Sequence, residues 1–226
     1  KLPNDPLFTK QWHLLNSGQS GGLDDEDIVA PEAWKRRSTS PNVVVAVIDG
    51  GIQLDHPDLI NNIWINKDEI PYNNWDDDNN GYKDDRYGWN FADQVPDPVI
   101  DPAGHGTHVA GIIGAEGNNG IGTTGVTWDV QLMPMDVFGI TDGAKFNELQ
   151  FWYKVLEAVD YAVDNGADVI NMSLGKLFNL NARQFFQNYP QFHQDTLNTL
   201  QKAVNNGTTV VIAAGNEKKD FNSQRW

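Results

Sequence analysis

The sequence predicts an α/β fold with a mostly parallel sheet and helices on both faces. Short apolar runs rich in β-branched residues indicate buried strands, and they cover residues 43–48, 131–137, 168–173 and 208–214. Helical patterns at 145–165 and 196–206 separate the later runs. Because strands that alternate with helices favour parallel pairing through right-handed crossovers, we expect one parallel sheet.

Residues 1–40 are predicted to be an irregular N-terminal segment, and residues 41–226 to form the α/β core of a single domain. The N-terminal segment carries aromatic residues without a long period, and its short helical stretch, 28–34, follows the acidic run 24–27. Acidic side chains stabilise a helix start because they face the positive end of the helix dipole. We therefore interpret the acidic run as a solvated helix start.

The core helices are predicted from apolar periodicity and from the glycines around them. One helix is expected to begin at His105, among glycines and small residues. The helix at 145–165 has the strongest period, and Gly166 ends it. No helix or strand is predicted for the polar, aromatic insertion 176–194 or for the tail 218–226.

Composition excludes several classes of function. The chain has 226 residues, no cysteine and a formal net charge of −15, so disulfide and thiolate chemistry are absent. Nucleic-acid and anionic-membrane binding are disfavoured because phosphate contacts need clustered Lys and Arg. No apolar run reaches the roughly 18 residues that a membrane helix needs. No signal peptide is visible in the chain from Lys1, and the start without Met suggests a processed product.

Polar residues follow three of the predicted strands. Asp49 ends the first run, Ser173 ends the third, and Asn216 comes just after the fourth. The carboxyl ends of parallel strands meet at one edge of a sheet, where ligands bind. We therefore expect these residues to gather there with His105, which opens a helix.

These residues are the parts of an acyl-transfer site that acts on peptides. A buried Asp49 would orient and stabilise an imidazole, and His105 would take a proton from a hydroxyl or water nucleophile. The amide of Asn216 would donate to a developing oxyanion. The segment 173–175 would pair with an extended peptide as an added strand.

The stretch 75–85 is predicted to be a calcium loop. Counted from Asp76, oxygen side chains stand at alternate positions, with glycine at the sixth and an acid at the ninth, as in the first part of an EF-hand loop. The twelfth position is Tyr87 and not glutamate, so closure must differ. The alternative is a disordered acidic loop, against which the flanking aromatic residues argue. The expected ligands are Asp76, Asp78, Asn80, Tyr82, Asp84 and Asp85.

Four motifs, in order, resemble the catalytic domain of the subtilisin-like serine proteases (subtilases). They are Val45-Ala46-Val47-Ile48-Asp49-Gly50-Gly51-Ile52, with His56-Pro57-Asp58-Leu59 just after it; the histidine motif 105–111; Asn171-Met172-Ser173-Leu174-Gly175; and Ala213-Ala214-Gly215-Asn216. The resemblance implies a subtilisin-like fold that is incomplete at the C-terminus, with residues 1–226 as the N-terminal portion of one peptidase domain. It also implies secretion or a cell-surface location.

The resemblance implies a role for each matching residue. Asp49 would be the orienting acid, His105 the general base and Asn216 the oxyanion donor, whereas His108 would have no catalytic role. Protein or peptide substrate would bind in a cleft lined by Ser173, Leu174 and Gly175. A Ca²⁺ ion would take Asp58 and Asn118, with Gln11 and backbone oxygens from residues 116–123.

Two departures from the family pattern matter. Gly50 stands where Ser or Thr usually follows the acid. The family's nucleophile lies in a Gly-Thr-Ser-x-Ala motif, and no serine of this chain does. The implied activity is a serine endopeptidase with an Asp-His-Ser triad, whose serine is supplied by the C-terminal remainder of the same protease.

Two other hypotheses stay open. A catalytically inactive subtilase-like binding or scaffold module would keep the cleft without the chemistry, although Asp49, His105 and Asn216 all remain. A metal-dependent hydrolase would use His105 and His108, which are three residues apart and can share a helix face. No glutamate stands between these histidines, in contrast to the helix-borne zinc protease motif.

Overall fold

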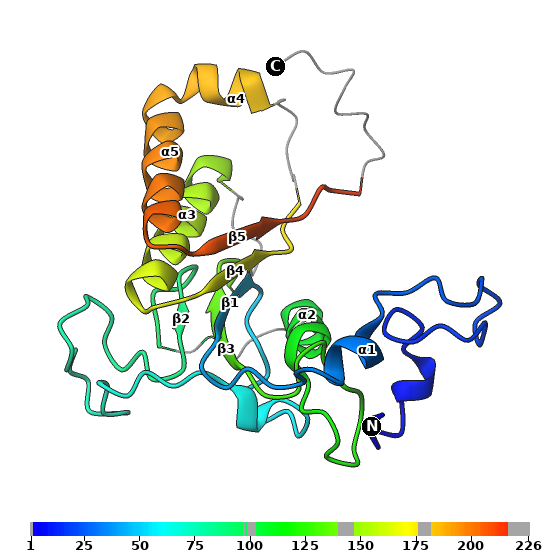
Figure 1. Ribbon diagram of the computed structural model, residues 1–226. Helices are drawn as coiled ribbons and strands as arrows, with labels where there is room; N and C mark the ends of the chain where they lie inside the picture. The colour runs from blue at the N-terminus through cyan, green and yellow to red at the C-terminus, as the bar shows by residue number, and fades with distance from the viewer. Residues whose placement is uncertain (1, 97, 99–102, 140–146, 176–181, 217–226) are drawn as a thin grey trace.

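A five-stranded sheet lies at the centre of the fold (Figure 1). The computed structural model describes residues 2–96, 98, 103–139, 147–175 and 182–216. The strand order is β2-β3-β1-β4-β5, and all four pairings between neighbours are parallel, as expected. The strands are β1 (Val44–Asp49), β2 (Trp89–Asn90), β3 (Gln131–Asp136), β4 (Val169–Met172) and β5 (Thr209–Ile212).

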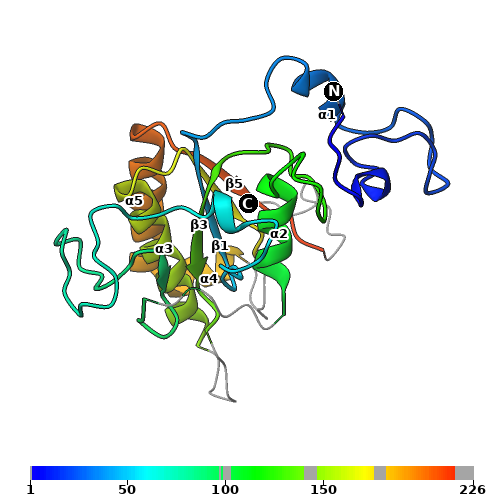
Figure 2. The same cartoon turned by 90° about the horizontal axis from the view of Figure 1, so that it is seen from below.

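Helices cover both faces of this sheet, as the sequence predicts. Helix α2 lies on one face, and α3 and α5 lie together on the other (Figures 1 and 2). No helix among the described residues is long and apolar enough to cross a membrane. The helices are α1 (Ala30–Trp34), α2 (His105–Gly114), α3 (Glu148–Asp164), α4 (Ala182–Asn188) and α5 (Pro190–Asn205), with 3₁₀ turns η1 (Phe8–Lys10) and η2 (Ile60–Asn62).

Strand β1 divides the core between the two faces. All six of its residues are buried. Val45 and Val47 pack in a cluster with Ala110 of α2, whereas Ala46 and Ile48 pack in a cluster with α3. Because successive strand residues point to opposite faces, a strand covered on both sides needs an unbroken apolar run. That run ends at Asp49, where the chain leaves the sheet.

The predicted strands agree with the structure to within two residues at each end. Helix α3 begins at Glu148 because the side chain of Asn147 accepts a hydrogen bond from the Gln150 N–H. The earlier predicted helical positions, 145 and 146, lie outside the described residues. Residues 2–40 hold only η1 and α1 as helical elements, in line with the predicted irregular segment.

The insertion 176–194 is more helical than expected. Helix α4 lies inside it, and α5 begins at Pro190, six residues before the predicted start at 196. The aromatic residues provide the reason, because Phe185 packs on Phe192 at a ring distance of 5.5 Å and Phe192 packs on Tyr153 of α3 at 5.1 Å. Residues 176–181 and the tail 218–226 lie outside the described residues.

Candidate active site

Asp49 and His105 form the centre of the candidate active site. Both carboxylate oxygens of Asp49 lie close to Nδ1 of His105, Oδ1 at 2.8 Å and Oδ2 at 2.9 Å. The Asp49 side chain is 2% exposed and the His105 side chain is 57% exposed. A buried carboxylate on Nδ1 keeps the proton on that nitrogen, which leaves Nε2 as the basic atom of the ring.

Glycines permit this contact between β1 and α2. Helix α2 begins at His105 directly after Gly104, whose φ is +70°. A Cβ at position 106 would lie 2.1 Å from the carbonyl oxygen of Gly51 and 3.1 Å from Cβ of Asp49. Only glycine at position 106 therefore allows the first turn of α2 to pack against the end of β1.

Two further hydrogen bonds hold the strand end. The backbone N–H of Gly50 donates to Oδ1 of Asp49 at 2.8 Å. The backbone N–H of Gln53 donates to Oγ1 of Thr107 in the first turn of α2 at 3.0 Å. The missing hydroxyl at position 50 thus leaves Asp49 with a local backbone donor.

The other predicted active-site residues follow neighbouring strands. The segment 173–175 directly follows β4, which pairs with β1 on one side and β5 on the other. The Asn171 side-chain amide donates to Oγ of Ser173 at 3.0 Å. Asn216 is exposed in the loop after β5, behind Gly215 with φ +90°. Parallel pairing therefore brings Asp49, 173–175 and Asn216 to the same carboxyl edge of the sheet.

An apolar cavity of about 300 Å³ lies beside this edge. Leu174, which is 6% exposed, forms one wall. The other walls come from α3, α4 and α5 and from strands β4 and β5. Helix α4 of the insertion therefore forms one wall of a cavity that also contacts the predicted substrate cleft at Leu174. The lining includes Trp152, Val155, Met172, Phe185, Phe186, Phe192 and Ile212.

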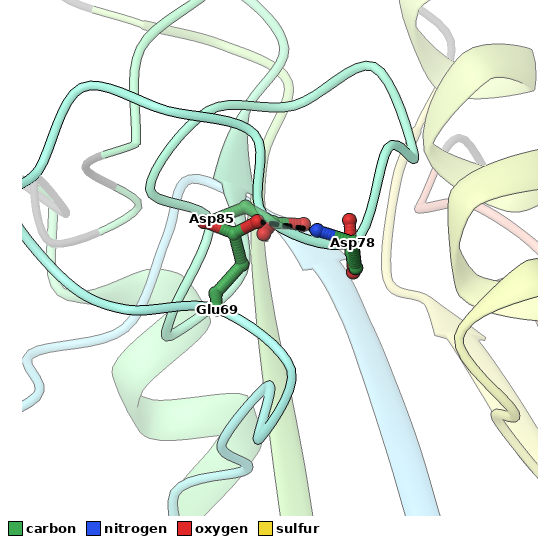
Figure 3. Close-up of side chains that lie close together, drawn as sticks. All are labelled: Glu69, Asp78 and Asp85. Atoms are coloured by element: carbon green, nitrogen blue, oxygen red, sulfur yellow. Dashed lines mark hydrogen bonds between the residues drawn. The ribbon is translucent and has the colours of Figure 1, made fainter.

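The acidic loop is ordered around three carboxylates that point toward one another (Figure 3). Among the described residues, Glu69, Asp78 and Asp85 are the one group of His, Asp or Glu ligand atoms close enough to hold a metal ion, with all three atoms within 4.8 Å of one another. Glu69 is 1% exposed and Asp85 is fully buried. Asp78 and Asp85 are predicted ligands, whereas Glu69 lies before the predicted loop.

The remaining predicted loop ligands have other contacts. Asp76 accepts from the backbone N–H groups of residues 80 and 81, and Asp84 accepts from those of residues 73 and 74. The Asn80 amide donates to Asp78 and Asp85. The Tyr82 hydroxyl donates to Glu157 at 3.2 Å. The structure therefore groups Asp78 and Asp85 with Glu69, and gives Asp76 and Asp84 the role of closing turns.

Burial makes negative charge costly in this group. It raises the pKa of Glu69 above its ordinary value, against the backbone N–H donors of residues 77 and 78. It also raises the pKa of Asp85, against hydrogen bonds from Tyr161, Asn80 and Asn66. The Tyr161 hydroxyl donates to Oδ2 of Asp85 at 2.6 Å. A divalent cation among these oxygens would offset the cost, because hard cations bind carboxylates.

The second predicted calcium site is a loop wrapped around Asp58. Asp58 is 3% exposed and accepts from the Thr123 N–H and from the side-chain amide of Asn119. The neighbouring Asn118 donates its backbone N–H to the buried Asp5. The structure thus places the side chain of Asn119 on Asp58, one position after the predicted Asn118.

Gln11 ties the N-terminal segment to the same loop. Its side-chain nitrogen donates to the carbonyl of Thr124 at 2.8 Å, and its side-chain oxygen accepts from the Thr124 N–H at 3.0 Å. Gln11 and Asp58 also line one cavity. Asp5 carries no sequence signal of its own, because its role depends on contacts with a loop more than 110 residues away.

His105 and His108 do not share a site. His105 contacts Asp49, whereas His108 lines the cavity that also contains Gln11 and Asp58. Neither histidine belongs to the metal-capable group described above. This separation gives no support to a metal-dependent hydrolase that uses both.

The comparisons with known proteins agree with this geometry. Residues 40–225 match the sequence model of the subtilase family. The extracellular basic protease of Dichelobacter nodosus is 32% identical over 99% of this chain and 36% of its own length. The major intracellular serine protease of Bacillus subtilis is 35% identical over 84% of this chain and 48% of its own length. The chain therefore spans less than half of these two relatives.

A solved structure gives the same answer for the fold. A protease from Pseudoalteromonas arctica superposes with a TM-score of 0.61 and 30% identity, over 96% of this chain and 60% of that one. The strand order, the position of the histidine helix and the family match together show that this chain belongs to the subtilase family of serine proteases.

Proposed function

We propose that this chain is the N-terminal portion of an active serine endopeptidase. The observation that carries the proposal is the pair formed by the buried Asp49 and the exposed His105, with Nδ1 within 2.9 Å of both carboxylate oxygens. A module used only for binding has no need of that pair. The nucleophilic serine is supplied by the C-terminal remainder of the same protease.

In the proposed reaction, Nε2 of His105 removes the proton from the serine hydroxyl as the oxygen attacks the peptide carbonyl carbon. Asp49 stabilises the imidazolium that forms, and the amide of Asn216 donates to the oxyanion. His105 then gives the proton to the leaving amine as the C–N bond breaks. Water hydrolyses the acyl-enzyme by the same steps, which restores the serine.

The proposed substrate is an extended protein segment that adds a strand along residues 173–175. Side chains of an added strand alternate between two faces, so one of them is directed toward the apolar cavity beside Leu174. A cavity of about 300 Å³ lined by aromatic and aliphatic residues favours a large apolar side chain at that position.

Calcium is the proposed cofactor. Glu69, Asp78 and Asp85 would hold one ion, supported by their mutual approach and by the burial of two of them. Asp58 and Asn119, with Gln11 and loop backbone oxygens, would hold a second. We also propose an extracellular location, which rests on the family resemblance and on calcium use; the two relatives named above include one extracellular and one intracellular protease by name.

Labelling with a fluorophosphonate tests the proposed activity. The full-length protein should carry the label on one serine outside residues 1–226, and His105→Ala should abolish labelling while His108→Ala retains it. A folded full-length protein that takes up no label would instead support the inactive binding module. If a chelator abolishes hydrolysis and zinc restores it while calcium does not, the metal-dependent hydrolase is supported.

A peptide library tests the proposed substrate preference. Phe186→Ala enlarges the cavity beside Leu174, so the preference should move toward larger apolar side chains at one substrate position. Leu197→Ala is the matched control, because Leu197 is 50% exposed on α5 and does not line the cavity. An unchanged preference in the Phe186 variant would separate the cavity from substrate binding and leave the proposed activity intact.

A further inference from the structure

Three of the five histidines of this chain line one cavity outside the candidate active site. The cavity measures about 480 Å³ and lies between the N-terminal segment, the loop after β1 and helix α2. His13 comes from the N-terminal segment, His56 from the loop and His108 from α2. None of these side chains has a place in the proposed peptidase reaction.

His13 is the unusual member. Its Nε2 atom is buried and has no hydrogen-bond partner among the described residues. A buried polar atom without a partner is uncommon in folded proteins and calls for a ligand or a water. Burial, and then the charge of His108, hold the pKa of His13 below its ordinary value, and both rings line the same cavity.

His56 is used differently. Its Nδ1 accepts a hydrogen bond from the Asp58 N–H at 3.2 Å. A neutral imidazole that accepts at Nδ1 carries its proton on Nε2, so that ring has no lone pair left for a metal. The cavity therefore offers two imidazole ligands, from His13 and His108.

Asp58 and Gln11, which would serve the proposed second calcium ion, bring the oxygen ligands of this cavity and already have hydrogen-bond partners in the loop. Asp58 accepts from Asn119 and Thr123, and Gln11 bonds both backbone groups of Thr124. Calcium selects oxygen ligands, whereas neutral imidazole suits zinc and similar transition metals. The unsatisfied atom in the cavity is a nitrogen, which favours the second class of ion.

We propose that His13 and His108 bind a zinc-type transition-metal cation, with water completing its coordination. The site joins the N-terminal segment to α2, three residues along the helix from His105. It is separate from the carboxylate group at Glu69 and does not depend on the proposed peptidase activity.

Titration calorimetry with zinc chloride on the calcium-saturated protein tests the site. One zinc ion should bind, and His13→Ala and His108→Ala should each weaken binding by at least about tenfold, because even the loss of an outer-shell partner of a metal ligand costs about 10–100-fold. His193→Ala is the matched control, because His193 is exposed on α5 and stacks on Phe186 away from the cavity. Wild-type zinc affinity in the His13 variant would overturn the proposal. So would a zinc affinity that falls in proportion as the calcium concentration is raised, because calcium would then occupy the same site.

A measurement on the unaltered protein covers the case in which a variant misfolds. Paramagnetic Co²⁺, used as the probe, should broaden the imidazole ring proton signals of His13 and His108 together. The ring signals of His193 should stay sharp. Broadening of His193 alone, or of all five histidines equally, would show that no defined site exists.

Discussion

Asp49 presents both of its carboxylate oxygens to Nδ1 of His105, at 2.8 and 2.9 Å, from the last residue of a fully buried strand. The acid is inaccessible and the base is exposed, so the pair is arranged for proton transfer toward solvent or substrate and not within the core. The consequences of this arrangement are open to direct measurement.

Asp49→Asn should remove most of the activity of the full-length protease. The amide cannot hold the imidazole in the required tautomer or stabilise its charged form, and an equivalent change in another serine protease lowers kcat about 10⁴-fold. Hydrolysis of a peptide ester, followed with thermal unfolding, gives the measurement. Asp55→Asn is the control on an exposed carboxylate nearby, and it should keep wild-type kcat. Similar rates for the two variants would remove Asp49 from the mechanism.

Gly106→Ala should destabilise the fold. The new methyl group would lie 2.1 Å from the Gly51 carbonyl oxygen, so α2 must move away from β1 at a cost of about 1–3 kcal/mol in unfolding free energy. Gly111→Ala, on the same helix, meets nothing within 4 Å and should stabilise by up to about 1 kcal/mol. Urea denaturation of both variants measures the contrast, and equal stability would show that the close approach is relaxed.

Local patterns account for the parts that the sequence predicts correctly. The run that ends in Asp49 and the glycine-flanked His105 each follow from a few adjacent residues, because burial on both faces and close backbone approach leave a mark in the sequence itself. Helix α4 and the start of α5 are not predicted, because Phe185, Tyr189 and Phe192 have helical spacing but stand among polar residues. The contact of Phe192 with Tyr153 of α3 decides the structure, and that contact is not local.

The residues of the proposed metal sites show the same limit. Glu69 lies outside the window of alternating oxygen ligands, and reaches Asp85 because the chain folds back on itself. Asn119 rather than Asn118 reaches Asp58, a difference of one position that depends on the turn at Gly120 and Gly122, both with positive φ. Asp5 is joined to that loop only by the tertiary fold.

Calcium should stabilise the protein more at neutral pH than at mildly acidic pH. The folded-state pKa values of Glu69 and Asp85 lie above the ordinary 4.5 and 3.8, so without a cation their contribution to stability is present at low pH and is lost as pH rises through the raised values. A bound cation reverses that loss, and it raises the free energy of unfolding by about 2.7 kcal/mol when free calcium is at a hundredfold excess over its Kd. Thermal unfolding with calcium and with chelator, from mildly acidic to neutral pH, measures the difference in Tm that calcium makes at each pH.

The calcium response should depend on the buried carboxylates. Asp85→Asn and Glu69→Gln should each lose most of the calcium-induced rise in Tm, whereas Asp24→Asn, on an exposed N-terminal carboxylate, should keep it. A full response in both buried variants would assign the stabilising ion to the loop around Asp58.

Strand β5 should make the isolated polypeptide 1–226 prone to self-association. Among the described residues β5 pairs only with β4, and Val211 and Ile212 are 47% and 59% exposed. A sheet edge with exposed apolar side chains is a template for pairing with another chain. Val211→Lys should therefore raise the concentration at which light scattering first detects oligomers. Val204→Lys, at a 64% exposed position on α5, adds the same charge away from the edge, and an equal gain there would attribute the effect to net charge and not to β5.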